Sequence, residues 1–322
     1  GSFCHNIFFA AEELFFMISK FGNVCVSIFV FLTAYGIAVS ILNQKDITMK
    51  EAFAQACKRF FKLMFHFVLL YISVILVMFP FFDLKGLYGG GWQGAICMLT
   101  DALGLQMFYG GITLNSTWWY MEIAYIMIFL VPVLTWIVKK IGYAILPLMY
   151  FLPFVFAINF DVERYLLVAT VGVCAAYGNW ITKGMEWKIP SAVKWLISLA
   201  GLSVCVVLRQ NYLIQEEYLA VVDALISLFV VWAVAVTIGM IPGVRKVFAF
   251  IGRHSMNIFL VHTFFYLSVF RAEIYYFKYA ALILLILLIV TLLYSVVLEG
   301  VKKMGRLMIN KIKGAMQKKK TV

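Results

Sequence analysis

Charge is scarce in this chain of 322 residues, and negative charge is the scarcer kind. Charged residues make up 13% of the sequence, with 15 Asp and Glu against 27 Lys and Arg, whereas a typical soluble domain has about 25%. Hydrophobic residues reach 64%, and the mean hydropathy is +0.97. The composition therefore excludes an ordinary soluble domain and predicts an integral membrane protein.

The sequence also lacks the paired cysteines of metal and disulfide sites. Zinc ligands usually come in clusters such as C-x-x-C, and an isolated buried cysteine behaves as a small hydrophobic residue. The six cysteines stand singly along the chain: Cys4, Cys25, Cys57, Cys97, Cys174 and Cys205. We expect no disulfide and no metal. Nucleic acid is not an expected partner either, because no aromatic-interleaved basic patch accompanies the positive charge.

Long apolar runs fill most of the chain instead. A helix needs roughly 20 residues to cross a hydrocarbon core about 30 Å thick, and the runs predict an all-α, polytopic bundle of about ten transmembrane helices. The predicted spans are 22–42, 55–82, 117–138, 141–159, 163–181, 191–208, 219–241, 255–270 and 279–300. The run at 3–18 contains Glu12 and Glu13 and is too short to cross alone, so we expect a truncated first helix.

The segment 92–109 decides the orientation of every later helix. Lys and Arg collect in cytoplasmic loops. If 92–109 does not cross, 21 of the 27 cations fall on the cytoplasmic side and six on the other; if it crosses, the counts become 9 and 18. We therefore predict that 92–109 is re-entrant or interfacial and that the C-terminus is cytoplasmic.

The last part of the chain is a basic tail. We predict a transmembrane domain over 1–300 and a basic cytoplasmic tail over 301–322, where eight cations follow one another without an acidic residue. Such cations attract anionic headgroups with about 1 kcal/mol each, so membrane lipid is an expected partner; a solvated flank of the last helix is the plainer interpretation. The sequence is compatible with a homo-oligomer.

Two of the titratable residues inside predicted spans are candidate site residues. His262 lies in the apolar stretch GRHSMNIFLVHTFFY, and Glu122 lies one turn inside its span, after Trp118 and Trp119. Ionisable side chains are costly in a membrane and usually face the bundle interior or a water-filled cavity. Both are therefore candidate site residues, although a buried histidine needs a hydrogen-bond partner in any case and tryptophans at a helix end are typical of an aromatic belt.

Four stretches together resemble the membrane acyltransferase 3 family, whose roughly ten-helix domain would cover nearly the whole chain. They are similar to the family motifs V-[DS]-[IL]-F-F-x-L-S-G-[FY], R-x-x-[RK], W-[FY]-L-x-x-E…P and G-x-x-S-x-x-I-[FY]-L-x-H. In this sequence they are VSIFVFLTAYGIAVS at 26–40, Arg59 to Lys62, Thr117 to Glu122 with Pro132, and Gly252 to His262. The first departs from the motif, with Thr33-Ala34 in place of Ser-Gly.

The resemblance implies an O-acyltransferase of the plasma (inner) membrane. Such an enzyme moves an acyl group, commonly acetyl, from cytoplasmic acyl-CoA to a hydroxyl of a cell-envelope glycan, such as a polysaccharide, or of a related acceptor. His5 falls where the family carries an essential first-helix histidine. The resemblance implies that His5 is the catalytic base; a histidine near the end of a chain is the alternative.

The chemistry of each residue type fits these roles. A neutral imidazole can take the proton of an attacking hydroxyl near neutral pH, as predicted for His5, and His262 could orient this base or stabilise the oxyanion. Glu122 could hold a histidine tautomer or bind acceptor hydroxyls. The rings of Trp118, Trp119 and Tyr120 could bind a sugar.

The donor is expected at the basic start of the second predicted span. A guanidinium binds phosphate through a bidentate fork, so we predict that Arg59 holds the phosphates of acyl-CoA, with Lys58 and Lys62 beside it. Ordinary positive-inside flanking is the alternative for all three.

Two other classes of protein fit a polytopic chain with buried polar groups. One is a transporter or flippase of small molecules, and the other is a non-catalytic sensor or uptake module on the same fold. Inverted repeats and paired broken helices would favour a transporter, and the sequence shows neither.

Overall fold

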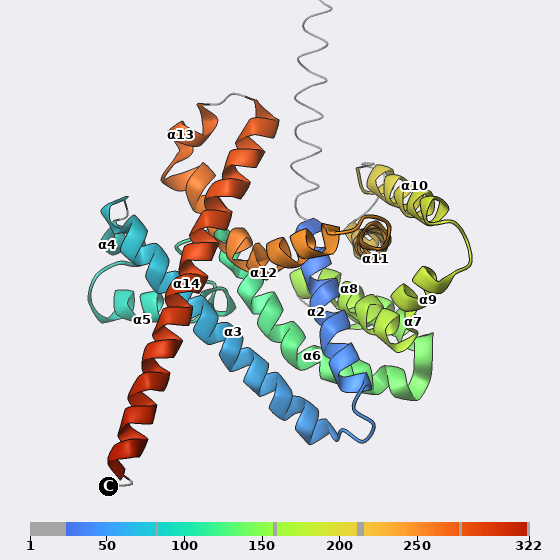
Figure 1. Ribbon diagram of the computed structural model, residues 1–322, viewed down its shortest axis with the longest axis horizontal. Coiled ribbons are helices and arrows are strands. Elements are labelled where there is room, and N and C mark those ends of the chain that lie inside the picture. The colour runs from blue at the N-terminus through green and yellow to red at the C-terminus, as the bar shows by residue number, and fades with distance from the viewer. Residues whose placement is uncertain (1–23, 82, 157–159, 211–215, 277–278, 321–322) are drawn as a thin grey trace, which may run out of the picture. The chain divides into compact units, whose positions relative to one another are not determined.

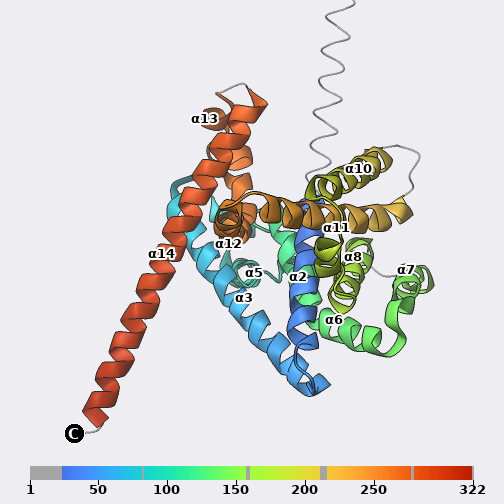
Figure 2. The ribbon, with the colours of Figure 1, turned by 45° about the vertical axis from the view of Figure 1, so that its right-hand side comes forward.

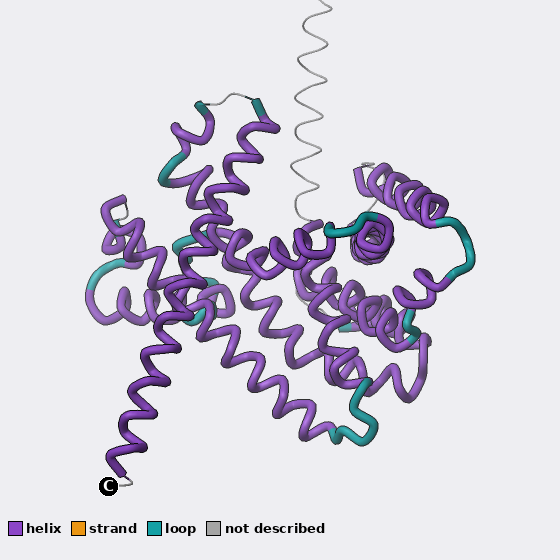
Figure 3. Tube along the Cα trace, viewed as in Figure 1, coloured by secondary structure: helices purple, strands orange, loops and turns teal. Residues whose placement is uncertain are grey.

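A computed structural model of the chain describes residues 24–81, 83–156, 160–210, 216–276 and 279–320. Every regular element in these ranges is a helix (Figure 3), which confirms the predicted all-α class. By length and apolar composition, six of the described helices could cross a membrane, or seven if a bent pair counts as one span. His5 and the predicted partial helix at 3–18 lie outside the described residues.

The chain forms two compact units. Residues Gly1–Phe61 and Ile123–Val244 make up the first unit, and residues Lys62–Glu122 and Arg245–Val322 make up the second. Two long helices contribute residues to both units, α3 (Met49–Met78) and α6 (Tyr120–Ile141).

The first unit is built around three long helices that lie side by side (Figure 1, Figure 2). They are α2 (Val24–Leu42), α8 (Phe160–Tyr177) and α11 (Glu216–Met240). Gly172 of α8 allows a close approach to α2, because a Cβ at this position would lie 2.7 Å from the carbonyl oxygen of Phe31. The remaining helices of this unit are α7 (Ile145–Val155), α9 (Trp180–Glu186) and α10 (Ser191–Gln210), of which α10 packs against α11.

The second unit contains the later part of α3 and the longest helix of the chain. Its other helices are α4 (Leu84–Tyr88), α5 (Gly91–Ala102), α12 (Val244–Thr263), α13 (Arg271–Tyr275) and α14 (Ala280–Lys320). A short π-helical segment, Phe264–Ser268, follows α12 directly. This unit holds most of the residues that the sequence singled out.

Helix lengths agree with the prediction in some places and differ in others. At 12 residues, α5 is too short to cross alone, as expected for 92–109. At 11 residues, α7 is also too short by itself, although 141–159 was predicted as a span. α12 begins about ten residues before the predicted 255 and is not among the apolar candidates for crossing, because its first half is basic. The predicted count of about ten spans is thus higher than the described helices support.

α14 also differs from the predicted span at 279–300. It continues without a break to Lys320, over 41 residues, which corresponds to about 60 Å. The basic tail from residue 301 is therefore a continuation of the last helix as far as the structure describes it.

Candidate functional site

Two of the four motif-bearing stretches meet in the second unit, at the backbone of α12. The carbonyl oxygen of Leu260 accepts a hydrogen bond from Asn115 Nδ2 at 3.2 Å and another from Trp118 Nε1 at 2.9 Å. Leu260 lies two residues before His262. The stretch around Thr117–Glu122 is thus attached directly to the turn of α12 that carries the predicted histidine.

The side chain of Asn115 bonds to both segments that meet at this junction. Its side chain caps the 3-10 turn Ser116–Trp119, because Oδ1 accepts from the backbone N–H and the hydroxyl of Thr117, both at 3.0 Å. The same Oδ1 accepts from the hydroxyl of Thr263 at 2.8 Å. Asn115 is 5% exposed, and buried amides of this kind are normally fully hydrogen-bonded.

His262 is half-buried, and its geometry selects one tautomer. Nδ1 lies 2.6 Å from the carbonyl oxygen of Phe259, to which it donates. In a neutral imidazole with Nδ1 protonated, the lone pair is on Nε2. The ring stacks on Tyr266, with centroids 5.7 Å apart and planes at 22°. The turn therefore presents an imidazole whose basic nitrogen is Nε2.

The helix changes its hydrogen-bond pattern immediately after this histidine. From Phe264 the backbone is π-helical, and the N–H of Val269 donates to the carbonyl oxygen of Phe264 at 2.9 Å. π-helical turns inside α-helices are rare and are frequent at functional sites. The change of pattern follows the turn whose carbonyl and threonine are engaged by Asn115.

The other predicted residues of this stretch differ in exposure. Trp118 is 2% exposed and packs edge-on against Phe67, with ring centroids 5.0 Å apart. Tyr120 is also buried, whereas Trp119 and Glu122 are half-buried. Trp119 is therefore the least buried member of the predicted trio.

A buried carboxylate orders the loop that leads to Asn115. Asp101 of α5 is 1% exposed and accepts from the hydroxyl of Tyr88, from the Thr113 hydroxyl at 2.8 Å and from the Leu114 N–H at 2.8 Å. The hydroxyl of Tyr71 in α3 donates to that of Tyr88 at 3.1 Å. Burial raises the pKa of the Asp101 carboxyl, and its three hydrogen bonds oppose this rise.

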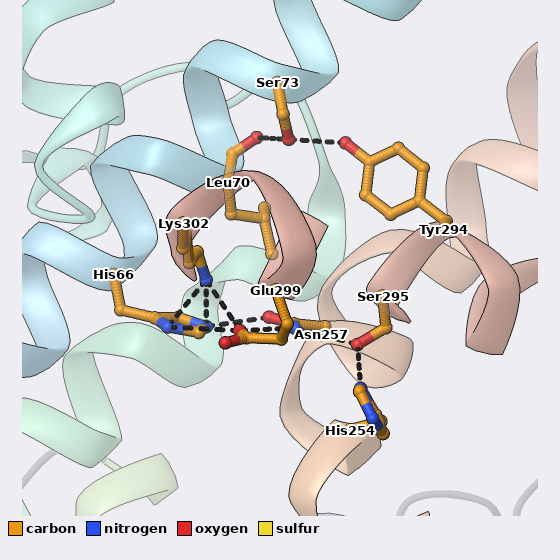
Figure 4. Close-up of polar contacts among 9 residues, drawn as sticks. All are labelled: His66, Leu70, Ser73, His254, Asn257, Tyr294, Ser295, Glu299 and Lys302. Carbon is orange, nitrogen blue, oxygen red and sulfur yellow. Dashed lines mark hydrogen bonds and ion pairs between the residues drawn. The ribbon is translucent and has the colours of Figure 1, made fainter. Parts of the chain in front are cut away.

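A second polar centre in the same unit joins α3, α12 and α14 (Figure 4). None of its members was among the predicted site residues. The side chains form one connected network: His66, His254, Asn257, Ser295, Glu299 and Lys302.

The hydrogen bonds of this network are directional and mutually consistent. Lys302 Nζ donates to His66 Nδ1 at 2.9 Å and to Glu299 Oε1 at 2.9 Å. His66 therefore carries its proton on Nε2, which donates to Asn257 Oδ1 at 2.7 Å. Asn257 Nδ2 in turn donates to Ser295 Oγ at 2.8 Å. A neutral His66 satisfies every one of these contacts.

The three residues predicted to bind acyl-CoA differ in environment. Arg59 donates from Nη2 to Ser40 Oγ at 2.9 Å, within the first unit. Its Nη1 is buried and has no hydrogen-bond partner among the described residues. Lys58 and Lys62 are exposed. Of the three, Arg59 is thus the residue with a buried side-chain nitrogen that has no hydrogen-bond acceptor among the described residues.

The first unit also holds a charged cluster that the sequence did not predict as a site. Asp223 is fully buried and accepts from Arg164 Nε at 2.7 Å, from Arg209 Nε at 2.8 Å and from Ser27 Oγ at 3.1 Å. The four residues come from the ends of α8, α10, α11 and α2. Their meeting agrees with the predicted alternation of these spans, which places all four ends on one side.

Sequence reasoning located His262, Glu122 and Trp118 but missed Asn115 and the network around His66. A signal existed for Asn115, since Asn followed by Ser and Thr is typical of a helix start. Glu299 lies at the end of the predicted span 279–300, and Lys302 lies in the predicted basic tail, so neither residue stood out as part of a site. Within the described residues, no three His, Cys, Asp or Glu are grouped as metal ligands.

No family model matches the chain, and no curated protein and no solved structure matches it either.

Proposed function

We propose that this chain is a membrane acyltransferase that moves an acyl group, in the first place acetyl, from acyl-CoA to a hydroxyl of a cell-envelope glycan or a related acceptor. The observation that carries the proposal is the attachment of Asn115 and Trp118 to the Leu260 carbonyl. It joins two of the stretches that resemble the acyltransferase 3 family at a histidine whose Nε2 is basic.

The reaction assigns one task to each group. His5 takes the proton of the acceptor hydroxyl as its oxygen attacks the thioester carbonyl, and coenzyme A leaves as a thiolate that takes the proton back. His262 stabilises the oxyanion or orients the base, and Glu122 fixes a histidine tautomer or binds acceptor hydroxyls. The chemistry needs no metal.

Arg59 is proposed to bind the donor. A buried guanidinium nitrogen without an acceptor attracts an anionic group, and the phosphates of acyl-CoA supply several. The side on which the predicted topology places Arg59 is the cytoplasm, where acyl-CoA is available. Lys58 and Lys62 are exposed beside it and contribute general attraction rather than a fixed contact.

A direct test uses purified protein in lipid or detergent, with labelled acyl-CoA and a mixture of envelope acceptors. We expect His5→Ala to abolish transfer while the donor still binds, and Arg59→Ala to weaken donor binding by about tenfold to a hundredfold, the usual effect of losing a charged hydrogen bond. Lys58→Ala is the matched control and should change binding little. Unchanged transfer rates in both His5→Ala and Arg59→Ala would contradict the proposal.

One observation favours the alternative function of a solute transporter. The His66, Glu299 and Lys302 network lies on helices that are candidates to cross the membrane, and ionisable groups in such helices often mark ion or proton paths. The same purified protein separates the two functions. Saturable binding of a solute without any acyl transfer or acyl-CoA hydrolysis would favour the transporter.

A further inference from the structure

We propose that Asn115 and Trp118 are positioning residues for His262, which they hold in its reactive geometry by bonding to the backbone of α12. This inference rests on the proposed function, because it assumes that His262 takes part in acyl transfer. It assigns to Asn115 a role that the sequence did not predict, and it gives Trp118 a backbone contact in place of a sugar-binding face.

The carbonyl oxygen of Leu260 has unusual hydrogen-bond partners. In a regular α-helix the carbonyl oxygen of residue i bonds to the N–H of residue i+4. The Leu260 oxygen also receives two side-chain donors from another part of the chain, Asn115 Nδ2 and Trp118 Nε1. Side chains that insert into the helical ladder are a known cause of local changes in helix geometry.

The helix geometry changes directly after the residues that Asn115 contacts. α12 ends at Thr263, whose hydroxyl donates to Asn115 Oδ1 at 2.8 Å, and the π-helical segment begins at Phe264. Since a π turn contains one more residue per hydrogen bond than an α turn, the residues after Thr263 are rotated relative to a continuous α-helix. Tyr266 belongs to this rotated segment, and its ring stacks on His262.

The contacts of Asn115 lie on both sides of His262 in the sequence. His262 lies between Leu260 and Thr263, the two residues that Asn115 engages, and its Nδ1 donates to the carbonyl oxygen of Phe259. A turn held at both ends limits the directions that the imidazole can adopt. Such a holding role matters because a displacement of about 1 Å at a reacting group can cost about a hundredfold in rate.

Conservative variants test these contacts. Trp118→Phe removes the indole N–H and keeps a ring against Phe67. Asn115→Asp keeps the oxygen that caps Thr117 and removes the donor to Leu260. Because each single variant keeps one of the two bonds, we expect each to shift the His262 spectrum and the kcat partway, and the double variant to shift both by more than the sum of the single shifts. Tyr294→Phe is the matched control, since it deletes another side-chain hydrogen bond of this unit, to Ser73, without touching Leu260 or the loop before Asn115.

Two readouts distinguish a positioning role from general stability. In the folded double variant, nitrogen NMR of labelled histidine, assigned with His262→Gln, should show the proton of His262 shared between Nδ1 and Nε2, whereas wild type and Tyr294→Phe should show it on Nδ1. The kcat should fall by about tenfold to a hundredfold, with the KM for acyl-CoA unchanged within about twofold.

The results distinguish a failure of this inference from a failure of the proposed function. An unchanged His262 spectrum and an unchanged kcat in the double variant would overturn the inference. If wild-type protein transfers no acyl group, the proposed function fails, whereas the NMR result still decides whether the two residues hold His262. Should the double variant not fold, Trp118→Phe is judged by the same spectrum, and a wild-type spectrum together with a wild-type kcat would again overturn the inference.

Discussion

Asp101 shows at the scale of one residue how a membrane-associated chain fixes a polar loop. Its carboxylate is almost fully buried, yet three donors surround it, two of them from the residues just before Asn115. Buried polar groups are tolerated where hydrogen bonds replace water. The position of Asn115, and through it of the Leu260 carbonyl, therefore depends on one carboxylate in α5.

The protonation of Asp101 gives a pH-dependent stability. Burial raises the pKa of this carboxyl in the folded chain above its value of about 3.9 in the unfolded chain. Between these values the folded chain holds the proton and the unfolded chain does not, so the free energy of unfolding falls as pH rises through the window and is level above it. This stability is fully present below the unfolded pKa.

Thermal unfolding in detergent, followed from about pH 4 upward, measures this effect. We expect the unfolding midpoint of wild type to decline with pH more steeply than that of Asp101→Asn, which has no proton to lose at this position. The exposed Asp83→Asn should retain the wild-type slope. An identical slope in Asp101→Asn and wild type would show that Asp101 does not titrate in this way.

Among the helices of the first unit, Asp223 connects four of them near their ends. Small residues let α2 and α8 approach closely, as at Gly172, and apolar packing by itself allows two such helices to slide. The contacts of Asp223 with Arg164, Arg209 and Ser27 fix the ends of four helices against one another. The cluster thus defines the register of this unit.

Removing the charge of Asp223 should destabilise the first unit. Asp223→Asn leaves two buried guanidiniums facing a neutral amide, and breaking a buried ion pair costs about 3–5 kcal/mol. The midpoint of thermal or chemical unfolding should fall accordingly. The exposed Asp46→Asn is the control, with an expected change within about 0.5 kcal/mol. An unfolding midpoint for Asp223→Asn equal to that of the control would contradict the role of the cluster.

At the scale of the whole molecule, the two units are interleaved in the chain. Each is built from two separate parts of the sequence, and α3 and α6 contribute to both. Several apolar helices of sufficient length make this a membrane protein. The asymmetry of Lys and Arg along the sequence predicts that the end of α14 is cytoplasmic and that α4 and α5 lie on the opposite side.

Labelling with a membrane-impermeant thiol reagent tests this orientation. In a chain without native cysteines, the exposed positions Lys85→Cys and Lys303→Cys lie in α4 and α14. We expect intact cells to label the first, and permeabilised cells to label both. Labelling of Lys303→Cys in intact cells would mean that the segment 92–109 crosses the membrane after all.

The helical class and the membrane character were readable from the sequence, because they depend on sums over local stretches. Composition and apolar run length do not require knowledge of distant partners. The ends of α12 and α14 were less predictable, since a fall in hydropathy does not stop a helix. Lys, Arg and Met are good helix formers, so α14 continues through its basic part to Lys320.

The sequence by itself determined which residues are chemically unusual for their surroundings, and so it singled out His262, Glu122 and Arg59. The contacts between residues far apart in the chain depend on the fold. Asn115 and Leu260 are 145 residues apart, and His66 and Lys302 are 236 apart, distances over which no local pattern carries information. The physical reason is that hydrogen-bond partners are chosen by packing between helices, whereas the helices themselves form from local composition.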